Sequence, residues 1–206
     1  MEYYNSNIQL MKDVCEDIVE TVIEKSKDVN EKISMLVWGL GYDSVLWNNI
    51  PNVDVYFIED NIKFIELNKG KIENDKMIYY EYPTETRESM NYTEKTLSEF
   101  KKPEIIFDLP KFDIILIDGP QGNTFYHPNL TSPGRILPLY WSKELSKKGT
   151  IIYIDDVHRC VETHGYKFYN YPIIKAWDDR KRDPHERFNT IKCCVGAEES
   201  NITLFK

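Results

Sequence analysis

Glycines and acidic residues follow short apolar segments of the sequence at a spacing that suits a nucleotide-type ligand. Gly39 and Gly41 come directly after one apolar run, and Glu59 and Asp60 close the next. Glycines at such a turn let a ligand approach the backbone, and an acid about twenty residues later can accept hydrogen bonds from ribose hydroxyls. The pattern indicates a site for an adenosine-type ligand, although a tight turn without a ligand would use the same glycines.

The residues around the glycine turn favour one ligand of this type. A dinucleotide fingerprint has a third small residue, usually glycine, where Ser44 stands, and no Gly-Lys-Ser/Thr sequence follows, as the phosphate-binding loop of an NTPase requires. S-adenosylmethionine (SAM) has no phosphate groups and needs only the glycine turn and the ribose acid. We therefore expect SAM as the cofactor.

A second group of candidate residues follows two later apolar segments. Asp118 ends one of them, and Asp155 and Asp156 end the other, with His158 close behind. Because ligand sites collect at the carboxyl ends of parallel strands, these acids predict one polar site along one edge of a sheet. Each acid could instead cap the helix that follows its strand.

These side chains allow more than one chemistry. The three aspartates offer oxygen ligands that suit a divalent cation such as Mg²⁺ or Mn²⁺. In a metal-free site, one of the acids or His158 would act as a general base. Arg135 and Arg159 could bind an acidic sugar or its phosphates, or form ion pairs on the surface.

The elements that must position these residues alternate along the chain. Helical periodicity covers 5–27, and a terminal antiparallel hairpin is expected from 191–195 and 202–205. The pattern predicts an α/β three-layer sandwich with a mostly parallel sheet, built as one domain over 1–206 with an N-terminal capping helix within 1–30. Further strands are expected at 33–38, 54–59, 77–82, 112–117 and 150–154, and further helices at 61–68, 84–100 and 134–147.

The composition excludes several classes of function. A formal net charge of −8 argues against a nucleic-acid partner, and no apolar run approaches the length of a membrane span. The four cysteines have no metal-ligand spacing and indicate reduced thiols in a cytoplasmic protein.

Several blocks of the sequence resemble the plant glucuronoxylan 4-O-methyltransferase family, a family with a polysaccharide-biosynthesis domain. Their order and spacing agree with that family, and together they span roughly residues 34–170. The combination of Gly-Leu-Gly-x-Asp-Ser, Asp-Gly-Pro and Pro-Gly-Arg is far more specific than the glycine pair alone. The blocks are 36–47, 57–60, 112–120, 132–135, and 152–159 with 161–162.

The resemblance implies a Rossmann-like class I SAM-dependent methyltransferase that methylates a sugar hydroxyl. It places Gly39, Gly41 and Glu59 on the cofactor motifs, with Asp43 and Asp60 close by. It also places Asp118 between the cofactor and the acceptor. The expected reaction is an in-line displacement in which the protein holds both partners near attack distance and a side chain removes the proton of the acceptor hydroxyl.

The chain departs from the family in two respects. The family has His-Asp-Val-Asp-Arg where this chain has Asp155-Asp-Val-His158-Arg. The exchange around Asp156 could change the general base, for which Asp118, His158 and Asp156 are the candidates, or create a metal site resembling that of macrocin-type sugar O-methyltransferases. The chain also lacks the membrane anchor of the plant proteins, so a soluble glycan precursor or nucleotide-linked sugar is the expected substrate.

Three other functions stay open on the sequence. One is a metal-dependent, catechol-type O-methyltransferase that acts on small molecules. Another is a catalytically silent protein of the same fold that serves as a binding subunit. The third, a nicotinamide-dependent oxidoreductase, is disfavoured by Ser44 in the fingerprint.

Overall fold

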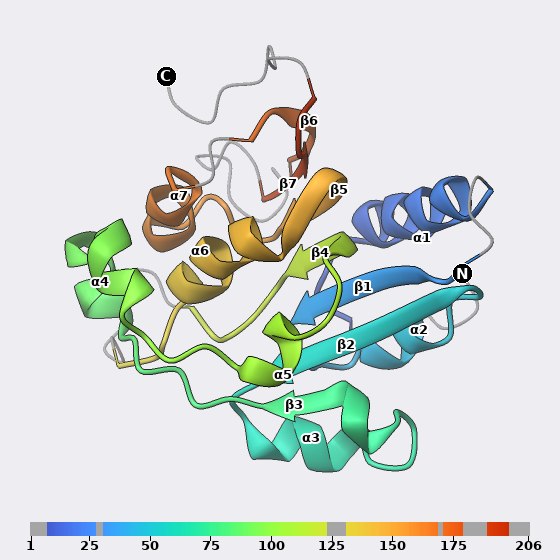
Figure 1. The fold of residues 1–206 in the computed structure, drawn as a ribbon, viewed down its shortest axis with the longest axis horizontal. Coiled ribbons are helices and arrows are strands. Elements are labelled where there is room, and N and C mark those ends of the chain that lie inside the picture. Colours follow the sequence, from blue (N-terminus) through green and yellow to red (C-terminus); the bar gives the residue numbers. More distant parts are fainter. Residues whose placement is uncertain (1–7, 28–30, 123–130, 169–170, 179–188, 198–206) are drawn as a thin grey trace.

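A single sheet of seven strands runs through the part of the chain that the computed structural model describes, which is 8–27, 31–122, 131–168, 171–178 and 189–197. The strand order is β3-β2-β1-β4-β5-β7-β6 (Figure 1). Neighbouring strands from β3 to β5 pair in parallel, and β7 pairs antiparallel with both β5 and β6. The strands are β1 (Ile33–Trp38), β2 (Val53–Glu59), β3 (Met77–Tyr79), β4 (Phe112–Ile117), β5 (Ser146–Ile154), β6 (Ile173–Trp177) and β7 (Thr190–Cys194).

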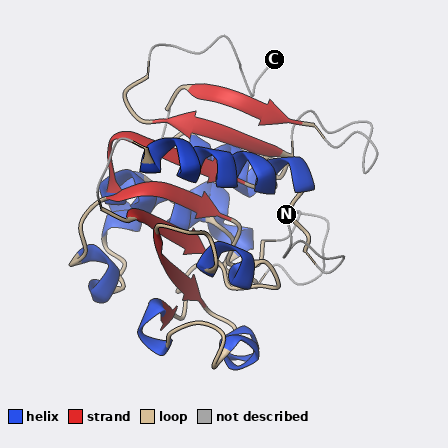
Figure 2. Ribbon diagram, turned by 90° about the vertical axis from the view of Figure 1, so that its right-hand side faces the viewer, coloured by secondary structure: helices blue, strands red, loops and turns tan. Residues whose placement is uncertain are grey.

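Helices cover both faces of the sheet, which confirms the predicted three-layer sandwich (Figure 2). Side chains alternate along each strand, so Met35 and Val37 of β1 face one apolar core while Leu36 and Trp38 face the other. The first core is closed by α1 (Lys12–Ser26), α2 (Ser44–Asn48) and α3 (Ile62–Asn68). The second is closed by α4 (Glu94–Ser98), α5 (Glu104–Phe107), α6 (Ile136–Leu145) and α7 (Cys160–Tyr166).

The N-terminal helix packs on the sheet as its periodicity predicts. Cys15, Ile18 and Val22 of α1 are fully buried in the first core. The helix begins at Lys12, later than expected, and residues 1–7 lie outside the described part of the chain. No helix in the described ranges combines the length and the apolar composition that a bilayer span requires.

The segment 84–100 is not the continuous helix that its polar composition predicts. It forms a short 3-10 helix, η2 (Thr86–Asn91), followed by α4, which a capping box between Thr93 and Thr96 begins. The backbone N–H and the hydroxyl of Thr86 both donate to the carbonyl of Ser132, at 2.7 and 2.8 Å. These bonds tie the start of the segment to the loop before α6.

Three other boundaries differ from the prediction. The strand expected at 77–82 ends at Tyr79, where β3 and its pairing with β2 end. The helix expected at 134–147 ends at Leu145, because Ser146 already pairs with Phe112 in the sheet. Residues 191–195 were expected to pair with 202–205, but β7 pairs with β5 on one edge and with β6 on the other. Residues 202–205 lie outside the described part of the chain.

Candidate active site

The turn after β1 lies directly against the turn after β4. The backbone N–H of Asp118 donates to the carbonyl of Trp38 at 3.0 Å, which holds the two strand ends together. A Cβ on Gly119 would stand 2.6 Å from the Cα of Gly39, and Gly39 itself has a φ of 111°. Both positions therefore require glycine, one for space and the other for space and backbone conformation.

The glycine turn is held in shape by two side chains. The N–H of Gly41 donates to the Ser44 hydroxyl at 2.8 Å. Glu59 at the end of β2 accepts from the N–H of Leu40 at 2.6 Å with Oε2, and from the N–H of Asn61 at 2.7 Å with Oε1. Burial raises the pKa of Glu59 to about 7. Each carboxylate oxygen keeps a second lone pair for a ligand donor.

Two more acids lie beside this turn. Asp43 is buried and accepts from the indole N–H of Trp47 at 2.9 Å with its Oδ2 atom. Burial raises the pKa of Asp43, and it also raises that of Asp60, the neighbour of Glu59. Acids with raised pKa values indicate a desolvated pocket wall.

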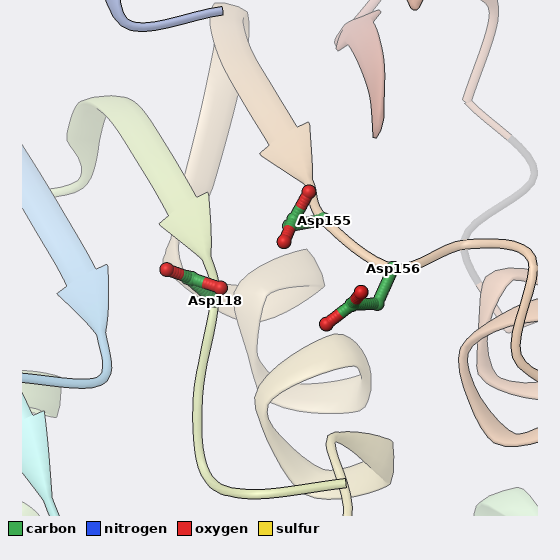
Figure 3. A group of neighbouring side chains, drawn as sticks. All are labelled: Asp118, Asp155 and Asp156. Atoms are coloured by element: carbon green, nitrogen blue, oxygen red, sulfur yellow. The ribbon is translucent and has the colours of Figure 1, made fainter. Parts of the chain in front are cut away.

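The second group of acids gathers at the ends of β4 and β5, where Figure 3 shows the carboxyl groups of Asp118, Asp155 and Asp156 around a shared space. One carboxylate oxygen from each residue lies within 4.8 Å of the others. Asp155 accepts hydrogen bonds from the Thr190 hydroxyl and the Asn189 amide of the β7 region. Asp156 adopts a φ of 57°, a left-handed conformation that non-glycine residues rarely adopt.

The Arg135 guanidinium lies among these acids. Its Nη2 atom is 2.9 Å from Asp156 Oδ2 and 3.3 Å from Asp118 Oδ1, and its Nη1 donates to the backbone carbonyl of Asp155 at 2.8 Å. Arg159 also contacts Asp156 Oδ2, at 2.9 Å. Burial and the nearby Asp155 carboxylate raise the pKa of Asp118, and Arg135 opposes that shift.

The three aspartates fit a divalent cation poorly. A metal bound in the shared space would have to share Asp118 and Asp156 with the buried, charged guanidinium of Arg135. The cluster therefore carries a cation of its own chain.

Sequence reasoning missed the acid behind this cluster. Glu162 on α7 is fully buried, and its Oε1 lies 3.9 Å from Nε of Arg135. Neither carboxylate oxygen has a hydrogen-bond partner among the described residues, and burial raises its pKa to about 7. Glu162 lies in the last block of the family resemblance, and this position in the block was the feature of the sequence that could have identified it. Asn189 and Thr190 offered no signal, because only the sheet brings them to Asp155.

All the predicted site residues line one cavity at the carboxyl ends of the parallel strands. Its volume is about 1150 Å³, and Ile62 and Phe64 of α3 add apolar surface to its wall. The predicted residues in its lining are Gly39, Gly41, Asp43, Glu59, Asp60, Asp118, Arg135, Asp155, Asp156, His158 and Arg159.

The strand order and the cavity at the strand ends define the fold as the Rossmann-like fold of class I SAM-dependent methyltransferases. Human Methyltransferase-like protein 13 in complex with SAH superposes with a TM-score of 0.53 at 15% identity, covering 91% of this chain and 84% of that one. Cofactor-bound Rv0187 from MTB gives a TM-score of 0.54 at 12% identity, covering 96% and 86%. The predicted fold class is thereby confirmed.

In sequence, the chain is similar to glucuronoxylan 4-O-methyltransferase 3 of Arabidopsis thaliana. The two are 27% identical over 184 residues, which is 79% of this chain and 59% of the relative. The resemblance predicted from the motifs is thus confirmed, while the chain spans about three fifths of the length of that relative. No protein-family model matches the chain.

Proposed function

We propose that the chain is a SAM-dependent O-methyltransferase that transfers a methyl group to the hydroxyl of a sugar in a glycan, a glycan precursor or a nucleotide-linked sugar. One observation carries the proposal: the glycine turn with Glu59 and the acid Asp118 line the same cavity. Ligand pockets commonly measure about 300–1,000 Å³, so a cavity of about 1150 Å³ has room for a cofactor and an acceptor together.

The half of the cavity beside β1 and β2 would hold the cofactor. Glu59 would accept hydrogen bonds from the ribose hydroxyls with the lone pairs that Leu40 and Asn61 leave unused. The bare backbone at Gly39 and Gly41 would lie against the rest of the cofactor, with Asp43 and Asp60 in the same wall. When bound, SAM supplies a methyl group on a positively charged sulfur.

The half beside β4 and β5 would hold the acceptor. Asp118 is our first candidate for the general base, because it lines the cavity and its raised pKa makes its carboxylate a stronger proton acceptor than an ordinary one. His158 lines the same cavity and is the second candidate. Asp156 forms ion pairs with both Arg135 and Arg159, so we assign it the role of positioning these two side chains instead of that of the base.

Arg159 is the side chain that would bind an acidic acceptor. Its side chain is 23% exposed and lines the cavity, whereas the guanidinium of Arg135 contacts carboxyl groups of its own chain. The name of the plant relative, a glucuronoxylan methyltransferase, supports an acceptor that contains an acidic sugar. A cytoplasmic location belongs to the same proposal and is supported by free thiols at Cys15, Cys193 and Cys194.

The proposal is tested by methyl transfer from SAM to UDP-glucuronic acid and to glucuronoxylan oligosaccharides. Asp118→Asn should lower kcat by roughly 10²- to 10⁴-fold, the usual contribution of a general base, while the affinity for S-adenosylhomocysteine (SAH) is kept. His158→Ala is measured in the same assay, and a comparable fall in kcat in this variant would instead identify His158 as the base. Near-normal turnover in both variants, with SAH still bound, would show that neither residue is the base. Failure of the wild-type protein to methylate any of these acceptors would count against the sugar substrate.

A further inference from the structure

The acid cluster at the ends of β4 and β5 has a cation built into it. Arg135 is 4% exposed, and its guanidinium contacts the carboxylates of Asp118 and Asp156 and the backbone carbonyl of Asp155. We infer that Arg135 is the resident cation of this cluster and takes the place of the divalent metal that three adjacent aspartates would otherwise attract.

The local backbone fixes the position of Arg135. Gly134 has a φ of 68°, and a Cβ there would stand 3.2 Å from the Thr86 hydroxyl and 3.4 Å from a methyl group of Val161. Arg135 follows at the start of α6, and its carbonyl accepts the N–H of Leu139 at 2.9 Å. The backbone at Gly134 and Arg135 therefore has little conformational freedom, and this keeps the guanidinium in the cluster.

The carboxylate oxygens of the cluster are already bound on one side. Asp118 Oδ1 and Asp156 Oδ2 face Arg135, and Asp155 Oδ1 accepts from Thr190 and Asn189. A metal bound to Asp118 and Asp156 would stand beside the fixed positive charge of the buried guanidinium. Like charges in such surroundings repel strongly, so the guanidinium and a metal exclude one another.

Glu162 balances Arg135 from behind. It is fully buried, lies 3.9 Å from Nε of Arg135, and packs so closely on Gly122 that a Cβ there would stand 2.7 Å from its Oε1. A buried carboxylate without a counter-charge is unfavourable, and Arg135 and Arg159 are the cations on this side of the cluster. Glu162 is thus a positioning residue for Arg135.

The inference bears on the proposed reaction, and in this part it rests on the proposed function. Arg135 favours the ionised form of Asp118, which burial and Asp155 disfavour. Removing the guanidinium should move the acidic limb of the kcat profile to higher pH. Arg135→Lys, which keeps the charge, should restore much of the wild-type pH profile. If Arg135 had only a structural role, removing its guanidinium would leave the acidic limb at the same pH.

The test measures Mn²⁺ binding by calorimetry in the wild-type protein and in Arg135→Ala, with Arg159→Ala as the matched control. Arg159 also contacts Asp156, but the structure shows no contact between its guanidinium and Asp118 among the described residues. We expect no Mn²⁺ binding at the cluster in the wild type or the control. We expect Arg135→Ala to bind Mn²⁺ at least roughly tenfold more tightly than the weakest affinity that the titration can detect, because the repulsive charge is gone. Adding Asp155→Asn to Arg135→Ala should abolish that gain.

Two results would overturn the inference. One is Mn²⁺ binding by the wild-type protein that Asp155→Asn abolishes, and the other is a folded Arg135→Ala protein that binds no Mn²⁺. Arg135→Gln, which keeps more of the side-chain volume, replaces Arg135→Ala if the latter does not fold, with the same expectation. SAH binding is measured on each sample, so loss of the proposed function, seen as no SAH binding by the wild type, is distinguished from failure of the metal prediction.

Discussion

At the scale of single residues, Glu59 both holds the glycine turn in place and contributes a titratable carboxyl group to the cavity wall. Its carboxylate accepts the N–H groups of Leu40 and Asn61, and burial raises its pKa to about 7. Only the ionised form has acceptor lone pairs on both oxygens for ribose hydroxyls as well. The affinity for a ribose-containing ligand should therefore depend on pH near neutrality.

We predict that SAH binds more tightly at pH 8 than at pH 6, because the ionised fraction of Glu59 rises with pH through a pKa of about 7. Glu59→Gln should weaken binding at pH 8 roughly 10- to 100-fold, the value of hydrogen bonds to a charged group, and flatten the pH dependence. Calorimetric titration at both pH values measures the effect, with Glu66→Gln on the exposed side of α3 as the control. Equal affinity of Glu59→Gln and wild type at pH 8 would contradict this role.

The sequence predicted some of these residues better than others. Glu59 was found from its spacing to Gly39, because the βαβ unit that joins them is local in the chain. Arg135 was expected to bind substrate, and its contacts with Asp118 and Asp155, 17 and 20 residues away, arise only when β4, β5 and α6 meet. Local patterns carry no information about such pairings.

At the scale of elements, the two turns that follow β1 and β4 depend on each other. We predict that Gly119→Ala destabilises the fold by about 1–3 kcal/mol and weakens SAH binding, because its Cβ would stand 2.6 Å from Gly39 Cα and force the turns apart. Gly70→Ala is the matched control. Gly70 has a φ of 75° but open space around it, so the change should cost about 1–2 kcal/mol of backbone strain and leave SAH affinity unchanged.

Urea unfolding and SAH titration of both glycine variants measure these effects. If Gly119→Ala bound SAH as tightly as Gly70→Ala does, the contact between the two turns would have no part in shaping the cofactor site.

The elements themselves were predictable where the signal is continuous and local. The apolar run 112–117 matches β4, because a buried parallel strand needs apolar residues on both faces. The strand β6 was missed, because its buried and exposed residues do not alternate regularly. The position of β7 between β5 and β6 depends on tertiary packing, which local sequence patterns do not predict.

At the scale of the whole molecule, buried carboxyl groups set the response of stability to pH. Burial raises the pKa of both Glu59 and Glu162 from an ordinary value of 4.5 to about 7. Below pH 4.5 both groups are protonated in the folded and unfolded states, and their contribution is fully present. As pH rises toward 7, ionisation favours the unfolded chain, so this stability is lost.

We therefore predict that the free energy of unfolding of the ligand-free protein falls between pH 5 and pH 7.5. Urea unfolding at a series of pH values measures the fall, and Glu162→Gln should make it shallower. Raised pKa values at Asp118 and Asp155 act in the same direction. Stability that stayed constant or rose over this range would show that these carboxyl groups are not desolvated in the folded protein.

Calorimetric titration of the purified protein with SAH shows whether the cavity at the strand ends binds the cofactor. The titration is run after chelation of divalent cations and again with added Mn²⁺. We expect one SAH site per chain, with the same affinity in both conditions because Arg135 already supplies the cation of the acid cluster. If SAH bound in neither condition, the glycine turn and Glu59 would be features of the fold alone and the cavity would not be a SAM site.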